Sequence, residues 1–333
     1  MKLTLKQVRE ITTGAVFVRE EGEGMVFSRF TDEQLEMYTK RDYLDIAPDM
    51  FRAPAGIRLH MRTDSRTLFL RVCATMSFAG RDYFSFDVFV NGEPAGHLDC
   101  IDPDAVKGVH EKTFALGEGV KEVQIHLPYS VLTTVQEVGL DDGAFVEPVR
   151  REKKLLCYGD SITQGYDAHR PSHTYPARLA DALHAECMNK GVGGDQVFPE
   201  LVETEEDFVP DYITVAYGAN DISYVKEVEF APVFRRFLTL LSQKHPNAKI
   251  FALSPIWRGN WENPWPIGTC ADMERVIREQ CEGLHNVTFL SGWEMVPHYC
   301  GYFRDGFLHP NDEGFDHYAA NLIAAVKQAL AKE

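Results

Sequence analysis

Short segments in which apolar and polar residues alternate dominate the first half of the chain. The pattern is clearest in GIRLHMRTDSRTLFLRVCAT at 56–75, YFSFDVFVNGEPAGHLD at 83–99 and KEVQIHLP at 121–128. A period of two is the side-chain period of a β-strand, and turn residues at Asp64-Ser65 and Asn91-Gly92 interrupt it. Several short strands joined by turns predict an antiparallel, jelly-roll-like β-sandwich over residues 1–150, with a short helix that begins near Thr31.

The pattern changes after the charged, proline-containing stretch EPVRREKK at 147–154. Short apolar runs now alternate with longer stretches of helical spacing, which predicts parallel βαβ units and a doubly wound α/β domain over residues 151–333. The expected strands are KLLCYGD at 154–160, DYITVAYG at 211–218, KIFALSP at 249–255 and NVTFLSG at 286–292. The expected helices lie within 173–186, 230–245, 270–284 and 311–333.

Charge and hydropathy exclude several classes of protein. The chain has 333 residues, of which 44% are hydrophobic, and a formal net charge of −16. Such a surface repels phosphate backbones, so we expect no nucleic-acid partner and no association with anionic membranes. No stretch has the pattern of a signal peptide or the length of a membrane span. Seven cysteines without close pairing are typical of reduced thiols, which favours a cytoplasmic location.

Chemically useful residues follow the predicted strands of the second half. They are Ser161 in GDSITQG, the glycines of NKGVGGDQ at 189–196, Asn220 in GAND and His309 in DGFLHPND. Ligand sites in doubly wound sheets lie at the carboxyl ends of the strands. A serine becomes a nucleophile when a histidine takes its proton and N–H groups hold the oxyanion. Each residue alone also has an ordinary structural explanation, as a helix cap, a turn or a surface loop.

In this order, the four segments resemble the sequence blocks of the SGNH (GDSL) hydrolase family over residues 153–331. The resemblance implies a flavodoxin-like sheet and a serine esterase that needs no metal or cofactor. It implies that Ser161 is the nucleophile and His309 the general base. The oxyanion donors would be the Ser161 and Gly194 N–H groups and the Asn220 side-chain amide. The chain also lacks a CxxC motif or a Cys/His cluster with the spacing of a zinc site.

The acidic member of the catalytic group departs from the family pattern. The family has Asp-x-x-His, but Gly306 stands three residues before His309 and Asp305 stands four before it. A one-residue bulge eased by Gly306 would still bring the Asp305 carboxylate to the imidazole, and we expect Asp305 to orient His309. A backbone carbonyl is the alternative. Asp312 is a further carboxylate nearby, and we expect it to cap the last helix.

The arrangement of the two halves indicates a substrate class. A β-sandwich ahead of an SGNH domain resembles the layout of the carbohydrate esterase family 2 deacetylases. Trp257, Trp261 and Trp265 follow the strand KIFALSP, and exposed indoles at the rim of the site would stack on sugar rings. We therefore expect a carbohydrate O-acetylesterase that acts on a small acetylated oligosaccharide. The opposing explanation is that one or two of these tryptophans only pack a domain interface.

Two other readings stay open at the level of sequence. The protein could be a general short-chain acyl esterase, thioesterase or lysophospholipase. It could instead be a carbohydrate-binding protein that retains an inactive hydrolase fold. The N-terminal half could bind glycan, cover the active site or mediate homo-oligomerisation, and the sequence does not choose among these roles.

Overall fold

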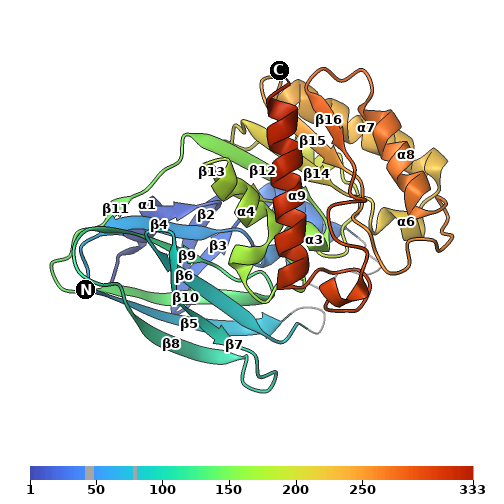
Figure 1. The fold of residues 1–333 in the computed structure, drawn as a ribbon. Helices are drawn as coiled ribbons and strands as arrows, with labels where there is room; N and C mark the ends of the chain where they lie inside the picture. Colours follow the sequence, from blue (N-terminus) through green and yellow to red (C-terminus); the bar gives the residue numbers. More distant parts are fainter. Residues whose placement is uncertain (42–48, 78–80, 333) are drawn as a thin grey trace.

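The computed structural model describes residues 1–41, 49–77 and 81–332, which form three β-sheets. Two antiparallel sheets face each other in the N-terminal half, and a parallel sheet flanked by helices forms the C-terminal half (Figure 1). This arrangement confirms the fold class expected from the sequence, a doubly wound α/β domain preceded by a β-sandwich.

The first sandwich sheet has the order β1-β4-β9-β6-β7, with β11 paired to the outer side of β4. The second has the order β2-β3-β10-β5-β8. The first sheet comprises β1 (Thr12–Thr13), β4 (Arg58–Thr63), β9 (Lys121–His126), β6 (Phe84–Val90), β7 (Glu93–Cys100) and β11 (Glu147–Pro148). The second comprises β2 (Phe17–Glu21), β3 (Gly24–Ser28), β10 (Val131–Leu140), β5 (Thr67–Ser77) and β8 (Gly108–Ala115).

Alternating burial explains why these sheets pack face to face. Along β5, Leu68, Leu70, Val72 and Ala74 are buried, whereas the residues between them are partly or fully exposed. The buried set joins the inward residues of the other strands in a single apolar core. Period-two burial is the sandwich pattern that the sequence predicts.

The parallel sheet has the order β13-β12-β14-β15-β16, in which the first strand in the sequence lies second. This is the flavodoxin-like order, and its crossover point lies between β13 and β14 at the carboxyl end of β12. The strands are β12 (Lys153–Gly159), β13 (Ala185–Asn189), β14 (Tyr212–Ala216), β15 (Lys249–Leu253) and β16 (Val287–Leu290).

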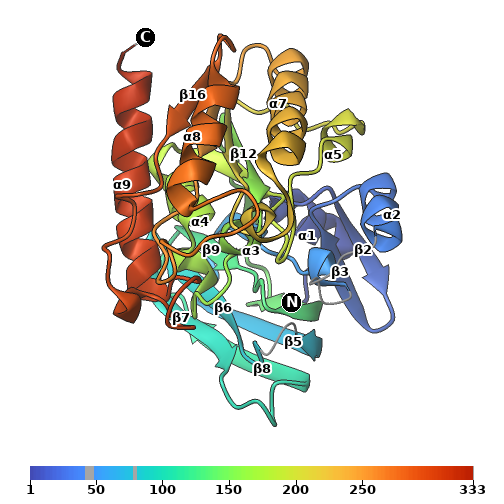
Figure 2. The same cartoon turned by 90° about the vertical axis from the view of Figure 1, so that its right-hand side faces the viewer.

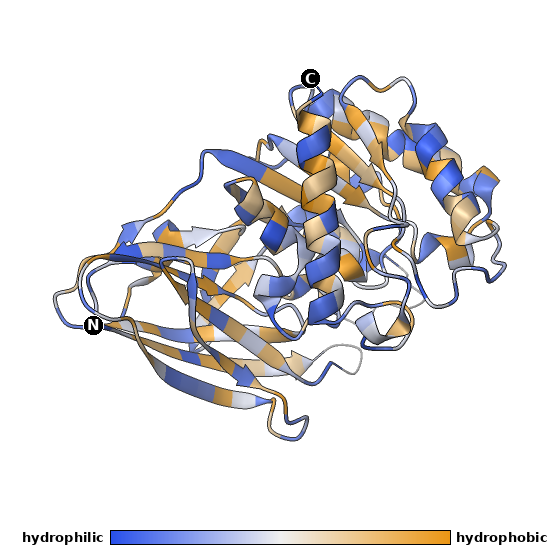
Figure 3. Ribbon diagram, viewed as in Figure 1, coloured by the Kyte–Doolittle hydropathy of each residue, from blue (hydrophilic) through white to orange (hydrophobic). Residues whose placement is uncertain are grey.

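Helices cover both faces of the parallel sheet (Figure 2). On one face α7 and α8 pack against Leu156 and Tyr158 of β12, and on the other α4 and α9 pack against Leu155 and Cys157. The strands are strongly apolar, whereas α9 carries polar residues on its outer side (Figure 3). The helices are α3 (Ser161–Gln164), α4 (Tyr175–Ala182), α5 (Glu200–Glu203), α6 (Asp221–Tyr224), α7 (Glu227–Lys244), α8 (Cys270–Cys281) and α9 (Asp312–Leu330), with single 3₁₀ turns at η2 (Pro171–His173) and η3 (Cys300–Tyr302).

One predicted helix is shorter than its sequence pattern suggested. The stretch 173–186 forms α4 only as far as Ala182, and β13 begins at Ala185. His184, with a positive φ of 49°, makes the reversal between them. The strand AECMN was missed because its few residues directly follow a helix of matching apolar spacing.

The N-terminal half also contributes to the core of the α/β domain. It contains α1 (Leu5–Ile11), α2 (Asp32–Lys40) and η1 (Met50–Arg52). Phe30, Leu35, Tyr38 and Phe51 belong to the apolar cluster that α7 and α8 cover. The division at residue 150 therefore stays a prediction: β11 ends at Pro148 and β12 begins at Lys153, but the apolar contacts cross that line.

Within the described residues, no helix has both the length and the apolar character needed to span a bilayer.

Candidate active site

Ser161 lies directly after β12, at the first residue of α3. The preceding Asp160 is the N-cap, and its Oδ1 accepts a hydrogen bond of 3.0 Å from the Ile162 amide. The explanation of Ser161 as a mere helix cap is therefore wrong, because Asp160 fills that position. Burial raises the pKa of Asp160 to about 7, although the Ile162 amide opposes the shift. Gly159 is required at this turn, since a Cβ there would lie 2.1 Å from Thr163 Oγ1.

The structure brings Ser161 and His309 together from segments that are far apart in the sequence. Ser161 Oγ lies 2.8 Å from His309 Nε2, within hydrogen-bond distance. On the other side of the ring, His309 Nδ1 lies 2.7 Å from Asp305 Oδ2. This geometry fits the tautomer in which Nδ1 carries the proton and Nε2 accepts one from the serine. A serine, a histidine and a carboxylate in line are the arrangement that activates a hydroxyl nucleophile.

The loop before His309 contains the bulge that the sequence suggested. Gly306 has a φ of +82°, a conformation that favours glycine, and this bend lets the Asp305 side chain turn back toward the ring. Asp305 Oδ1 accepts hydrogen bonds from the amides of Phe307, Leu308 and His309. Burial would raise the pKa of Asp305, but the bonds from His309 and the Leu308 and Phe307 amides hold it well below its usual range.

Asp312 has a different place from the one expected. The N-cap of α9 is Asn311, whose side chain accepts a hydrogen bond from the Gly314 amide. Asp312 Oδ1 instead accepts hydrogen bonds from the amides of His169 at 2.7 Å and Arg170 at 3.3 Å. The expectation that Asp312 caps the helix is wrong, because Asp312 is already the first helical residue and Asn311 occupies the N-cap position before it. Asp312 ties the start of α9 to the loop after α3.

The glycine-rich segment after β13 lies against α3. A Cβ at Gly191 would lie 2.5 Å from the Gln164 amide nitrogen, and the Gly193 amide donates to Gln164 Oε1 at 2.7 Å. Gly194 follows with a φ of +78°. Close packing against α3, which begins at Ser161, therefore requires glycine here. Gly194 lies three residues after Gly191 on the same loop.

Asn220 lies in the segment after β14 and occupies the N-cap position of α6. Its Nδ2 donates a hydrogen bond of 2.9 Å to the backbone oxygen of Asp195, the residue next to Gly194. The structure thus links Asn220 to the Gly194 loop. One N–H of the amide fixes the side chain, and an amide nitrogen has a second hydrogen to donate.

Residues of the N-terminal half bind the glycine-rich loop at 189–196. The buried guanidinium of Arg29 donates to the backbone oxygens of Asn189 and Gly191 as well as Ala53. Asp195 Oδ2 accepts a bond of 2.9 Å from Tyr38, and its Oδ1 forms an ion pair of 2.8 Å with Arg41. Sequence reasoning missed these contacts because the partners lie about 150 residues apart, with no motif to join them.

A second unpredicted group lies beside His309. Arg81, between β5 and β6 of the sandwich, forms a two-pronged ion pair with Asp167, at 3.0 and 2.9 Å. Asp167 Oδ2 is 3.8 Å from His309 Nδ1, and Arg81 Nη2 is 3.5 Å from the same nitrogen. The only local signal is that Asp167 stands two residues after the GDSITQG segment.

The three tryptophans do not form an exposed row. Trp261 is only 6% exposed and packs on Trp293, so the expectation of an exposed indole at this position is wrong. Trp257 and Trp265 are half-buried, and Trp257 stacks on His298. The loop is folded inward because the indoles cover the apolar cluster beneath α7 and α8. The more exposed aromatic residues nearby are Phe307, at 40%, and Tyr299, at 67%.

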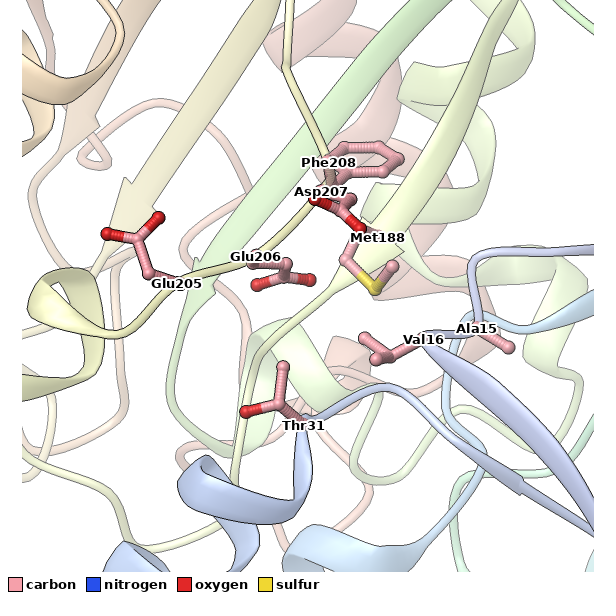
Figure 4. A pocket seen from close by; sticks show the side chains of 8 residues that line it. All are labelled: Ala15, Val16, Thr31, Met188, Glu205, Glu206, Asp207 and Phe208. Carbon is pink, nitrogen blue, oxygen red and sulfur yellow. The ribbon is translucent and has the colours of Figure 1, made fainter.

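Two other features could suggest a ligand but do not involve the serine. Ligand-type atoms of Asp167, Asp305 and His309 lie within 4.8 Å of one another, but the Arg81 guanidinium already neutralises Asp167, so we assign no metal site. A cavity of about 360 Å³ is lined by Thr31, Met188 and the segment 205–208, with Ala15 and Val16 at its side (Figure 4). Its lining contains none of the predicted site residues.

Comparison with known families identifies the chemistry of this site. Residues 157–317 match the GDSL-like Lipase/Acylhydrolase family. The matched region contains Ser161, Gly194, Asn220 and His309. Most of the α/β part of the chain thus resembles GDSL-like acylhydrolases, and this match supports an ester hydrolase. Comparison with curated protein sequences found no match.

Solved structures share the whole two-part architecture. A salicylyl-acyltransferase, SsfX3, from a tetracycline biosynthetic pathway is 24% identical, with a TM-score of 0.77 over 95% of this chain and 94% of that one. A structure described as a GDSL-like lipase from Bacteroides ovatus is 21% identical, with a TM-score of 0.76 over 99% and 98%. A family two carbohydrate esterase from Cellvibrio japonicus is 17% identical, with a TM-score of 0.65 over 97% and 96%. At these identities the likeness is one of fold.

Proposed function

We propose that this esterase removes O-acetyl groups from carbohydrates through a covalent acyl-enzyme on Ser161. The observation that carries the chemistry is the line from Ser161 Oγ through His309 to Asp305, with contacts of 2.8 and 2.7 Å. The same line disfavours an inactive, carbohydrate-binding protein, because a binding module has no need of a serine aligned with a histidine and a carboxylate.

In the proposed reaction, His309 Nε2 takes the Ser161 proton as the oxygen attacks the ester carbonyl carbon. The negative charge that develops on the carbonyl oxygen is held by the N–H groups of Ser161 and Gly194 and by the Asn220 amide. When the C–O bond of the ester breaks, His309 gives the proton to the leaving alcohol. Water then attacks the acyl-enzyme by the same route, with His309 as its base, and releases the acid and free Ser161.

Asp305 keeps the ring in the productive tautomer and stabilises the imidazolium that forms in each step. The hydrogen bonds from His309 and the loop amides lower the pKa of Asp305, which favours its carboxylate form. The three amides on Oδ1 and the Gly306 bend fix the carboxylate, so the imidazole is oriented before substrate binds.

Two observations support a carbohydrate as the alcohol part. The sandwich and hydrolase layout is shared with structures described as family two carbohydrate esterases. Phe307, 40% exposed and two residues from His309, offers an aromatic face where the leaving alcohol would lie. Tyr299 is a second exposed aromatic residue. These residues replace the buried Trp261 as candidates for stacking on a sugar ring.

Acyl transfer to an alcohol is a second candidate, and the similarity to the salicylyl-acyltransferase structure favours it. The acyl-enzyme is common to both reactions, since the outcome depends on whether water or another hydroxyl attacks. A general short-chain esterase, thioesterase or lysophospholipase shares the same first step. The alternatives therefore differ in the acyl and alcohol pockets, not in the roles of Ser161 and His309.

The decisive experiment is acetate release from acetylated xylan, mannan and chitin oligomers, measured beside acetyl, butyryl and octanoyl p-nitrophenyl esters. We expect acetyl esters to exceed octanoyl esters by at least about tenfold in kcat/KM, a difference of about 1.4 kcal/mol. Equal or better octanoyl cleavage would favour a lipase or thioesterase. Transfer of the acyl group to an added alcohol faster than to water would favour the transferase.

A further inference from the structure

The Arg81–Asp167 pair joins the β-sandwich to the predicted catalytic histidine. Arg81 follows β5, which ends at Ser77, and precedes β6, which begins at Phe84. Asp167 lies just after α3 and has a φ of +69°. Its amide donates a hydrogen bond of 2.8 Å to the hydroxyl of Tyr129, which is itself 2.6 Å from the hydroxyl of Tyr83. Both halves of the protein therefore fix the position of the carboxylate.

The pair is close enough to His309 to act on it through charge. Asp167 Oδ2 lies 3.8 Å from His309 Nδ1, beyond hydrogen-bond distance, whereas Asp305 Oδ2 lies at 2.7 Å. The side chain of Asp167 is 4% exposed and that of Arg81 is 20% exposed, so solvent screens these charges poorly.

The groups that face the His309 ring are Ser161 from α3, Asp305 from the loop that carries His309, the Tyr166 ring, Asp167 and Arg81. Arg304, also from its own loop, turns its guanidinium onto the Tyr83 ring at 4.2 Å.

We propose that Arg81 and Asp167 form a charge-balanced pair that sets the proton affinity of His309, and that the sandwich thereby fixes the pH range of the enzyme. A guanidinium and a carboxylate at nearly equal distances have opposing effects on an imidazolium, and these effects cancel when both are present. Asp305 alone then sets the charge seen by the ring. The inference rests on the proposed role of His309 as general base, and Arg81 and Asp167 act as positioning residues.

The proposal makes predictions of opposite sign for the two single variants. Arg81→Met leaves an uncompensated carboxylate beside the ring, which favours the imidazolium, so deprotonation of His309 requires a higher pH. Asp167→Asn leaves an uncompensated guanidinium, which disfavours the imidazolium, so deprotonation occurs at a lower pH. Asparagine also tolerates a positive φ, so Asp167→Asn keeps the backbone. In the double variant both charges are absent, and the midpoint returns toward that of the wild type.

The test is an NMR titration of the His309 ring in the full chain, with the signal assigned by its loss in His309→Asn. It needs no turnover, so it is independent of whether the esterase proposal holds. We expect the midpoint to rise by about one pH unit in Arg81→Met, to fall by a similar amount in Asp167→Asn, and to return to within about 0.3 unit in the double variant. Arg81→Lys, which keeps the charge, stays close to the wild type.

The matched control is Arg19→Met, which breaks another two-pronged arginine–aspartate pair, with Asp32, on the exposed surface. It is expected to leave the His309 midpoint unchanged. The acidic limb of kcat/KM against pH, measured with p-nitrophenyl acetate, is expected to move with the NMR midpoint. Coincident midpoints in all the variants, whatever their stability or kcat, would overturn the proposal. Shifts of the same sign in both single variants would also overturn it, because they would indicate a general loosening of the site.

Discussion

Asp305 Oδ2 contacts His309 Nδ1 at 2.7 Å although the two residues are one position further apart than in the family pattern. The extra residue is absorbed at Gly306, whose positive φ turns the loop so that the carboxylate reaches back to the ring. The remaining oxygen of Asp305 is occupied by three backbone amides. A carboxylate held by these four contacts is suited to orient a catalytic base.

Asp305→Asn is therefore expected to reduce kcat by about 10²–10⁴, since the amide cannot stabilise the imidazolium and can select the wrong tautomer. Steady-state kinetics with p-nitrophenyl acetate measures the loss. Asp312→Asn is the matched control, because the Asp312 side chain accepts hydrogen bonds from the amides of His169 and Arg170 and not from the His309 ring. Its kcat is expected to stay within about tenfold of the wild type. A large loss in Asp312→Asn with a near-normal Asp305→Asn would reverse the assignment.

The low pKa of Asp305 also predicts a pH dependence of stability. A carboxyl group whose pKa is lower in the folded than in the unfolded chain contributes stability that is present above the unfolded value of about 4. That contribution is lost as the pH falls below about 4 toward the folded pKa. Thermal melts between about pH 2 and 6 should show a smaller acid-induced decrease in Tm for Asp305→Asn than for the wild type. Parallel curves for the two proteins would contradict the ion-pair geometry.

Asn220→Ala is expected to reduce kcat by about 10²–10³, the usual cost of one oxyanion donor. KM should change far less, because the ground-state carbonyl makes the weaker hydrogen bond. Asn321→Ala is a suitable control, since this asparagine on α9 donates to the backbone oxygens of Glu294 and Met295, away from Ser161. If Asn220→Ala changed KM alone, Asn220 would be a substrate-positioning residue instead.

Arg29 offers a test of how far the N-terminal half supports the Gly194 loop. Arg29→Met removes the donor to three buried backbone oxygens, and each unpaired group costs about 1–3 kcal/mol. We expect a clear decrease in Tm together with a decrease in kcat, because the loop that carries Gly194 loses its support. Arg52→Met, on an exposed arginine paired with Asp49, should alter neither by a comparable amount. A wild-type Tm in Arg29→Met would show that the loop holds its shape unaided.

The parallel sheet, the placement of Ser161 and Asn220 after two of its strands, and the position of His309 just before the last helix were predictable from the sequence. Such predictions depend on local patterns: the apolar run that ends in Gly-Asp-Ser, and the glycine that follows Asp305. The Arg81–Asp167 pair and the contacts of Arg29 depend on how two distant segments pack, and no local pattern encodes that. Trp261 was misjudged for the same reason, since a tryptophan in a polar loop is exposed or buried according to the cluster beneath it.

The position of Asp312 shows how small a difference separates two structural roles. Asn311 and Asp312 are both good N-cap residues, and the sequence offers no clear preference between them. The N-cap is Asn311, one residue before the expected Asp312. The Asp312 side chain instead accepts hydrogen bonds from the amides of His169 and Arg170. Backbone amides of the loop after α3 thus bind a side chain at the start of a helix about 140 residues further along the chain.

The rate of p-nitrophenyl acetate hydrolysis by Ser161→Ala tests the central claim most directly. If Ser161 is the nucleophile, the variant should lose several orders of magnitude in kcat, because serine and histidine act as a unit, while its thermal melt stays close to that of the wild type. Each protein is also mixed with p-nitrophenyl acetate and measured by intact-mass spectrometry. This should detect an added acetyl group on the wild type and none on the variant. Retention of more than about a tenth of the wild-type kcat by Ser161→Ala would contradict the account.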